Sequence, residues 1–131
     1  MSHFRKIFVI VIFSFGYATS FGQVLIPMDN EEQADHLKAY GLVFEAIDKG
    51  YECHWLLNHR GGSFVILDAD QFIIQKALLK GVSYENNSAS TLISLMGELK
   101  SPSTNTNTVE LERVPKIAVY SPAGKQPWDD A

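Results

Sequence analysis

Cysteine is almost absent from this chain of 131 residues, and positive charge is scarce. The single thiol, Cys53, can form neither an internal disulfide nor a zinc site of several thiolates, so the apolar core must hold the fold together. Eleven Lys and Arg stand against 15 Asp and Glu, which gives a formal net charge of −4. This balance excludes a basic nucleic-acid module as the default, and it offers no surface for anionic lipid. The composition of the whole chain, with 46% apolar and 20% charged residues, is typical of one globular domain.

The N-terminal segment 1–22 has the features of a secretory signal peptide. Two basic residues lie within 1–6, a run follows at 7–15 that is apolar except for Ser14, and small residues come after it. The run is shorter than the roughly 20 residues that a membrane-spanning helix needs. We therefore expect cleavage before Gln23, export to the periplasm or the outside of the cell, and a single mature domain over 23–131 with no membrane contact.

Three segments have the apolar periodicity of amphipathic helices and are bounded by capping residues. They predict helices over about 30–49, from 68 or 70 to 80, and from 88–90 to about 100. The side chains predicted to face the core are, helix by helix, Leu37, Tyr40, Phe44 and Ile47; Phe72, Ile73, Ala77 and Leu78; and Leu92, Leu95, Met96 and Leu99.

Apolar and β-branched runs before, between and after these helices predict strands. They lie at 24–28, 52–57, 63–67, 82–84, 109–111 and 117–120, and the polar segment 101–108 is typical of a surface connection. Strands that alternate with helices imply right-handed crossovers and therefore an α/β fold with a mostly parallel sheet covered by flanking helices. We expect the first half of a Rossmann-like or amidotransferase-like sheet, truncated inside a further helix that starts at 128–131.

Polar residues that follow the predicted strands indicate a ligand site. If strands 24–28, 52–57 and 117–120 run parallel, the residues after them leave the sheet at its carboxyl edge, where open α/β sheets bind ligands. An anion there would meet the backbone N–H groups of a two-glycine loop, although a tight connection between two neighbouring strands explains the same loop equally well. The candidate ligand-binding residues are Asp29, Asn58, Arg60, Gly61, Gly62, Ser63 and Lys125.

Other chemical groups support only structural roles. Cys53 and His54 are neighbours on a predicted strand, so their side chains should point to opposite faces, and we expect Cys53 to be a buried thiol. Asp29, His36 and His59 lack a metal-ligand spacing. No metal, cofactor or catalytic residue is predicted.

Six short segments spread over the mature chain share a pattern with known proteins. They are 26–29 (I-P-M-D), 36–41 (H-L-K-A-Y-G), 55–64 (W-L-L-N-H-R-G-G-S-F), 81–85 (G-V-S-Y-E), 116–122 (K-I-A-V-Y-S-P) and 124–131 (G-K-Q-P-W-D-D-A). The pattern resembles a family of exported bacterial proteins labelled asparagine synthetase B. Members of that family are much longer, so the resemblance implies that this chain is an N-terminal fragment.

The resemblance also implies a glutamine-hydrolysing asparagine synthetase. Such enzymes use a cysteine at the mature N-terminus and an S-G-G-x-D-S loop that holds pyrophosphate, whereas this chain has an internal Cys53 and a loop, 60–63, that lacks the Asp-Ser ending. No catalytic residue is therefore carried over. Our leading hypothesis is a non-catalytic exported fragment that binds a small molecule. The alternatives are the N-terminal part of a glutamine amidotransferase-like enzyme and an exported interaction module that associates with itself through an uncovered sheet edge.

Overall fold

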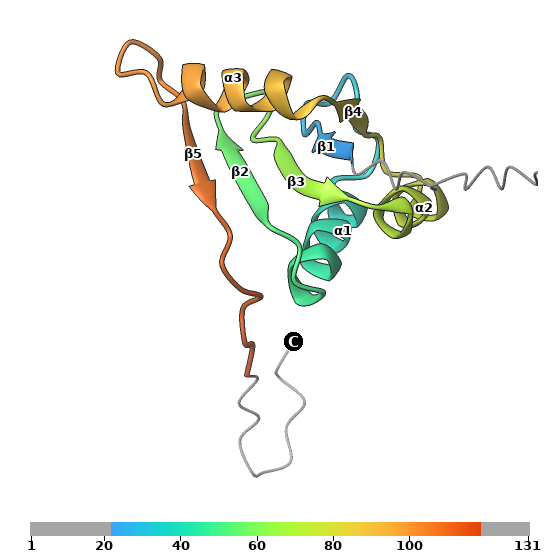
Figure 1. Ribbon diagram of the computed structural model, residues 1–131. Helices are drawn as coiled ribbons and strands as arrows, with labels where there is room; N and C mark the ends of the chain where they lie inside the picture. The colour runs from blue at the N-terminus through green and yellow to red at the C-terminus, as the bar shows by residue number, and fades with distance from the viewer. Residues whose placement is uncertain (1–21, 119–131) are drawn as a thin grey trace, which may run out of the picture.

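The computed structural model describes residues 22–118, which form five strands and three helices (Figure 1). Residues 1–21 of the expected signal peptide, Lys125, and the expected helix start at 128–131 lie outside the described residues. In chain order the elements are β1 (Gly22–Ile26), α1 (His36–Asp48), β2 (Cys53–Leu57), β3 (Phe64–Ala69), α2 (Gln71–Lys80), β4 (Glu85–Asn87), α3 (Ala89–Leu99) and β5 (Asn107–Glu110).

The strands form one sheet in the order β4-β1-β3-β2-β5, and every neighbouring pair is antiparallel. The prediction of a mostly parallel, Rossmann-like or amidotransferase-like sheet is therefore wrong. The short segment 58–63 joins β2 to β3 as a hairpin, and a hairpin connects antiparallel neighbours. Because β3 then lies between β1 and β2, those two strands run in the same direction without touching. The chain does make a helical crossover between them, but it leaves room for a third strand.

The first four strands and first two helices follow the β-α-β-β-α-β order of the split βαβ, or ferredoxin-like, plan. The remaining elements extend this plan, since β5 lengthens the sheet beyond β2 and α3 covers the face opposite α1 and α2 (Figure 1). Successive strand residues serve the two faces in turn: Val24 and Ile66 pack with α1 and α2, whereas Leu25 and Val65 pack with α3. This plan supports many unrelated functions, so it does not by itself define one.

Helix α1 differs from its prediction at its start and in its buried face. Asp29 accepts a hydrogen bond from the Glu32 backbone N–H (2.9 Å), but this makes an isolated turn, and the helix begins only after its N-cap, Asp35. The predicted stripe is wrong for Leu37 (82% exposed), Tyr40 and Phe44. The buried face comprises Ala39, Leu42, Val43 and Ala46.

The physical reason lies in two competing stripes on one helix. Ala39, Leu42, Val43 and Ala46 repeat at i, i+3, i+4 and i+7, which is the same helical period as the predicted stripe. Periodicity therefore permits both stripes, and the larger side chains of the stripe with Leu37 favoured that one, which is wrong. The two alanines allow close approach of the helix to the sheet.

Helices α2 and α3 agree with the sequence in their boundaries. Asp70 caps α2 through the Phe72 backbone N–H, Gly81 ends it in the left-handed conformation (φ 68°), and Ser88 caps α3 through the Thr91 N–H. In α2, Ile73 and Ala77 are buried as expected, but Leu78 is exposed.

The later strands are displaced from their predicted positions. β4 lies at 85–87 and not at 82–84, and β5 begins two residues before the expected 109–111. Of the strand expected at 117–120, Ile117 and Ala118 have no regular structure and the rest lies outside the described residues. Among residues 22–118, no helix is long and apolar enough to cross a membrane.

Candidate functional site: a pocket under helix α3

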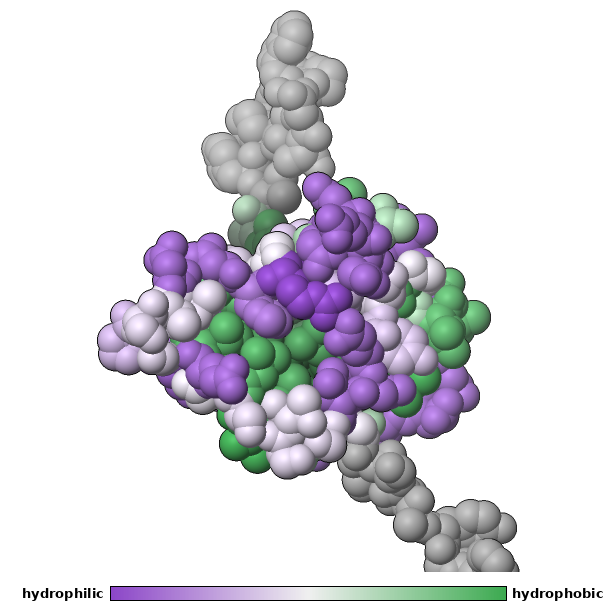
Figure 2. Space-filling view, turned by 90° about the horizontal axis from the view of Figure 1, so that it is seen from above, coloured by the Kyte–Doolittle hydropathy of each residue, from purple (hydrophilic) through white to green (hydrophobic). Residues whose placement is uncertain are grey.

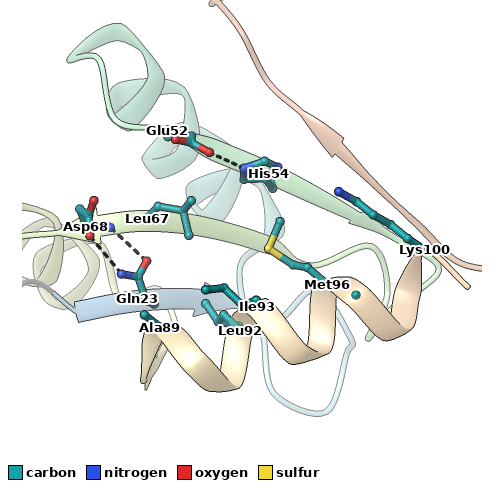
Figure 3. Close-up of a pocket in the computed structure, with 11 residues that line it drawn as sticks. Gln23, Glu52, His54, Leu67, Asp68, Ala89, Leu92, Ile93, Met96 and Lys100 are labelled. Carbon is teal, nitrogen blue, oxygen red and sulfur yellow. Dashed lines mark hydrogen bonds and ion pairs between the residues drawn. The ribbon is translucent and has the colours of Figure 1, made fainter.

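A pocket of about 390 Å³ lies between α3 and the sheet face formed by β1, β2 and β3 (Figure 3). Its volume falls within the range of small-molecule sites, about 300–1,000 Å³. We call it the α3 pocket. Its lining residues are Gln23, Glu52, His54, Leu67, Asp68, Ala89, Leu92, Ile93, Met96, Gly97 and Lys100.

The middle of the α3 pocket is apolar. Leu92 is buried against the sheet, Leu67 and Met96 are partly buried beside it, and Ile93 extends the apolar surface outward. The small residues Ala89 and Gly97 leave the space open, and a Cβ built on Gly97 meets no atom within 4 Å. Seen from the side on which α3 lies, hydrophobic residues gather in the centre of the molecule and hydrophilic residues frame them (Figure 2).

An imidazole and a carboxylate from β2 and its approach line one wall. His54 is buried, and its Nε2 lies 2.9 Å from Oε1 of Glu52, so the ring nitrogen donates to the carboxylate when it carries a proton. The two side chains share a face because residues two apart in an extended chain do so. Cys53, between them, points into the core on the opposite face, as the sequence predicts.

A second polar pair closes the same end of the pocket. The Gln23 side-chain amide donates to Oδ1 of Asp68, and the Asp68 backbone N–H donates to Oε1 of Gln23, both at 3.1 Å. Asp68 has a positive φ of 47°, at the place where the register of β1 and β3 shifts. A bulge of this kind redirects a side chain, and a strained residue beside a cavity is typical of a binding site.

Lys100 provides positive charge at the other end of the pocket. It follows α3 directly, and its side chain extends over the pocket toward His54, while Glu52 and Asp68 lie beyond His54 (Figure 3). Within residues 22–118, no hydrogen bond or ion pair engages its Nζ. The pocket therefore combines an apolar centre, an acidic end whose carboxylates already have partners, and a basic end whose ammonium has none in the part of the chain that is described.

The residues predicted at the carboxyl edge also meet, although on a different surface. Nε of Arg60 lies 3.2 Å from Oδ2 of Asp29, and its Nη1 lies 2.7 Å from Oε1 of Glu85. The Met28 backbone N–H donates to the Arg60 carbonyl (3.0 Å). Asp29 and Arg60 meet because β1 and β2 run in the same direction on either side of β3, and not because those strands pair. Desolvation alone would raise the pKa of Asp29, but hydrogen bonds from the Glu32 N–H and Arg60 hold it below its usual value.

The polar groups of this loop have partners inside the protein. Asn58 donates to the Asn105 carbonyl (2.8 Å), and the buried Ser63 hydroxyl donates to the His59 carbonyl (3.0 Å). Gly61 and Gly62 both have positive φ angles, as a tight strand connection requires. The structure thus places most of the predicted residues together in a hairpin connection. Their role in ligand binding stays a prediction, and Lys125 lies outside the described residues.

The remaining chemical groups of the sequence do not converge. No group of His, Cys, Asp and Glu with metal-binding geometry occurs among residues 22–118. Nε2 of His36 lies 3.0 Å from the Met28 carbonyl, and burial followed by the nearby Arg60 charge lowers the pKa of His59. Burial raises the pKa of Cys53 to about 12, which leaves it a thiol at physiological pH.

The sequence contained one usable signal for the α3 pocket. Glu52 and His54 alternate around Cys53, which places a carboxylate and an imidazole on the same face of a strand. Nothing in the sequence connects them with Lys100, which comes close only because α3 crosses that face. Comparison of the chain with protein-family models, with curated proteins and with solved structures finds no match.

Proposed function

We propose that the protein is an exported, non-catalytic binding domain that holds a small amphipathic carboxylate in the α3 pocket. The observation that carries the proposal is the combination of an apolar pocket centre with the ammonium group of Lys100 at one end. Export rests on the signal peptide expected from segment 1–22. This pocket lies on a different surface from the residues predicted at the carboxyl edge, and the parallel sheet on which that prediction rested is not formed.

The ammonium group of Lys100 favours an anionic head group at its end of the pocket. Glu52 already bonds to His54, and Asp68 to Gln23, so both carboxylates have internal partners. A ligand carboxylate at Lys100 would form a charge-assisted hydrogen bond, which is stronger than a neutral one. At this end, a cationic head group would instead meet the same-sign charge of Lys100. The acidic end then disfavours a second anionic group, so a monocarboxylate fits better than a dicarboxylate.

The apolar centre favours an alkyl or similar chain attached to that head group. Leu67, Leu92 and Met96 offer surface that a chain can cover, and each buried methylene contributes about 0.8 kcal/mol. Two further methylenes should therefore tighten binding by about tenfold, as long as they stay inside the pocket. Chain length thus provides a direct measure of the apolar contact.

Binding without catalysis is supported by the position of the thiol. Cys53 lies on the face of the sheet opposite the α3 pocket, and burial raises its pKa to about 12. A nucleophilic cysteine needs the opposite environment, one that lowers its pKa.

Calorimetric titration of the purified protein with octanoate, decanoate and decanol tests this function. Decanoate should bind about tenfold more tightly than octanoate. Lys100→Gln should weaken the binding of both carboxylates and leave the affinity for decanol unchanged. The matched variant Lys38→Gln, which alters a lysine on α1, should change none of the three affinities. Equal carboxylate affinity in wild type and Lys100→Gln would refute the proposed head-group contact.

A second variant tests the location independently of charge. Gly97→Leu places a side chain where the structure has open space and should abolish binding of all three ligands. Gly41→Leu, on α1, is the control because its Cβ also meets nothing within 4 Å. Circular dichroism should show that both variants fold. Undiminished binding in Gly97→Leu would place the ligand elsewhere.

A further inference from the structure

The strand β5 is an edge strand whose hydrogen-bonding pattern can be derived from its register. It pairs with β2 so that Trp55 lies opposite Val109, and the Leu111 N–H donates to the Cys53 carbonyl at 2.9 Å. Hydrogen-bonded residues alternate along an antiparallel ladder, and Val109 lies two residues before Leu111. The N–H and C=O groups of Val109 therefore also face β2. Those of Thr108 and Glu110 face the free edge.

The free edge is partly protected by the protein itself. The Thr108 N–H donates to the side-chain oxygen of Asn107 at 2.8 Å, a local bond that a pairing strand would replace. The other outward groups, including the Glu110 N–H, have no strand beside them among residues 22–118. Unpaired backbone groups of this kind are a template for another strand.

An aromatic row leads to this edge on the face that α1 covers. The Tyr40 ring meets Phe64 edge-on with centroids 5.6 Å apart, and Phe64 stacks on Trp55 at 6.2 Å. Trp55 and Val109, which are 39% and 40% exposed, continue the row to the edge of the sheet. The apolar surface therefore reaches the outermost strand, where a partner that pairs with β5 would cover part of it.

The register at β5 is self-complementary. A two-fold axis at Val109 places Val109 opposite its own copy and places Thr108 opposite Glu110 of the second chain. The Glu110 carboxylates then do not face each other directly, so the pairing avoids the like-charge contact that destabilises cross-strand pairs. An interface of this kind, with the same patch on both chains, is the usual form of a symmetric dimer.

We propose that two copies of the protein associate through antiparallel pairing of their β5 strands, centred on Val109, to form one continuous sheet. Val109 and Trp55 lie on the face opposite the α3 pocket, because residues next to Trp55 in β2, Leu56 and His54, face α3. The dimer therefore leaves the pocket open, and this inference does not depend on the proposed function.

Sedimentation equilibrium over a range of protein concentrations tests the dimer. Wild-type protein should show a reversible monomer–dimer equilibrium, and Val109→Lys should raise its dissociation constant by more than about tenfold because two ammonium groups would face each other. Val109→Glu should do the same, because two carboxylates would then face each other. Asn86→Lys, at the opposite edge of the sheet on β4, is the matched control and should leave the equilibrium unchanged.

Mixing the two variants provides the decisive measurement. Only a two-fold axis at position 109 places the introduced ammonium of one chain opposite the introduced carboxylate of the other. An equimolar mixture of Val109→Lys and Val109→Glu should therefore associate although neither variant does alone. Circular dichroism of each variant reports that the fold remains. A monomeric wild type, or a mixture that stays monomeric while wild type dimerises, would overturn the proposal. A dimer that persists in Val109→Lys would also overturn it, by locating the interface elsewhere.

Discussion

Gly61 is the position at which a single methyl group should damage this fold most clearly. Its φ is +76°, and a Cβ added there would lie 2.3 Å from the Met28 carbonyl oxygen and 2.8 Å from the Asp29 backbone nitrogen. Both neighbours are backbone atoms of the segment that follows β1, so no side chain can rotate away. The hydrogen bond from the Met28 N–H to the Arg60 carbonyl holds these two segments together at the same point.

Gly50 offers a control that separates the clash from backbone strain. Its φ is +87°, but a Cβ there meets no atom within 4 Å. Gly50→Ala should therefore lower the free energy of unfolding only by the strain of holding an alanine in the left-handed conformation, about 1–2 kcal/mol. Gly61→Ala should add about 1–3 kcal/mol for overpacking against the Met28 carbonyl. The difference between the two variants isolates the contact between the β2–β3 connection and the end of β1.

Urea unfolding followed by circular dichroism measures this difference. With a slope of about 1–3 kcal/mol/M, the midpoint of Gly61→Ala should lie roughly 1 M below that of Gly50→Ala. The fitted slopes should agree between the two variants, since both expose the same surface on unfolding. Equal midpoints would refute the reasoning, because they would mean that 58–63 is not packed against the residues after β1.

Four further outcomes follow from individual positions. Gly41→Ala should stabilise the protein by about 0.5–1 kcal/mol, because Gly41 lies inside α1 and its Cβ would meet nothing; thermal melting would show the rise. Ser88→Ala should cost about 0.5–2 kcal/mol by removing the N-cap of α3, whereas Ser88→Asp should not. The hydrogen bond with Tyr51 is the chief reason that the pKa of Asp70 is lowered. The stability that ionised Asp70 contributes should therefore be complete above pH 3.8 and lost as the pH falls below it. Between pH 5 and pH 2, Asp70→Asn should accordingly lose less stability than the wild-type protein does. Cys53 should react with a thiol reagent far more slowly in the native protein than in urea, and equal rates would contradict its burial.

The two candidate sites differ in how far the sequence determines them. The sequence placed Asp29 and the segment 58–63 at one edge, and the structure joins Asp29 to Arg60 by an ion pair. These residues share an edge because β1 and β2 run in the same direction on either side of β3, and not because the two strands are paired neighbours. The α3 pocket escaped prediction because it depends on the path of α3 across the sheet, which brings Lys100 toward His54.

The sequence by itself determined the local features of this protein. It offered Asp68 or Asp70 as the cap of α2 and residues 88–90 as caps of α3, from which the structure selects Asp70 and Ser88. It also placed Gly81 at the end of α2 and turned Cys53 and His54 to opposite faces. Each of these depends on interactions within a few residues, such as a cap, a left-handed φ or the alternation of a strand. Such interactions are present wherever the segment is placed, so the pattern predicts them, although at α1 the Asp29 turn does not continue into the helix, which begins after Asp35.

Only the tertiary structure decided the order of the strands and the face that α1 buries. A crossover from β1 through α1 to β2 leaves the same local pattern whether the two strands pair or a third strand lies between them. The hairpin at 58–63 brings β3 into that gap, and the sheet then selects the stripe with Ala39 and Ala46 over the one with Leu37. Strand pairing is a contact between distant segments, and burial depends on what covers a surface, so neither is encoded in the period of a single element.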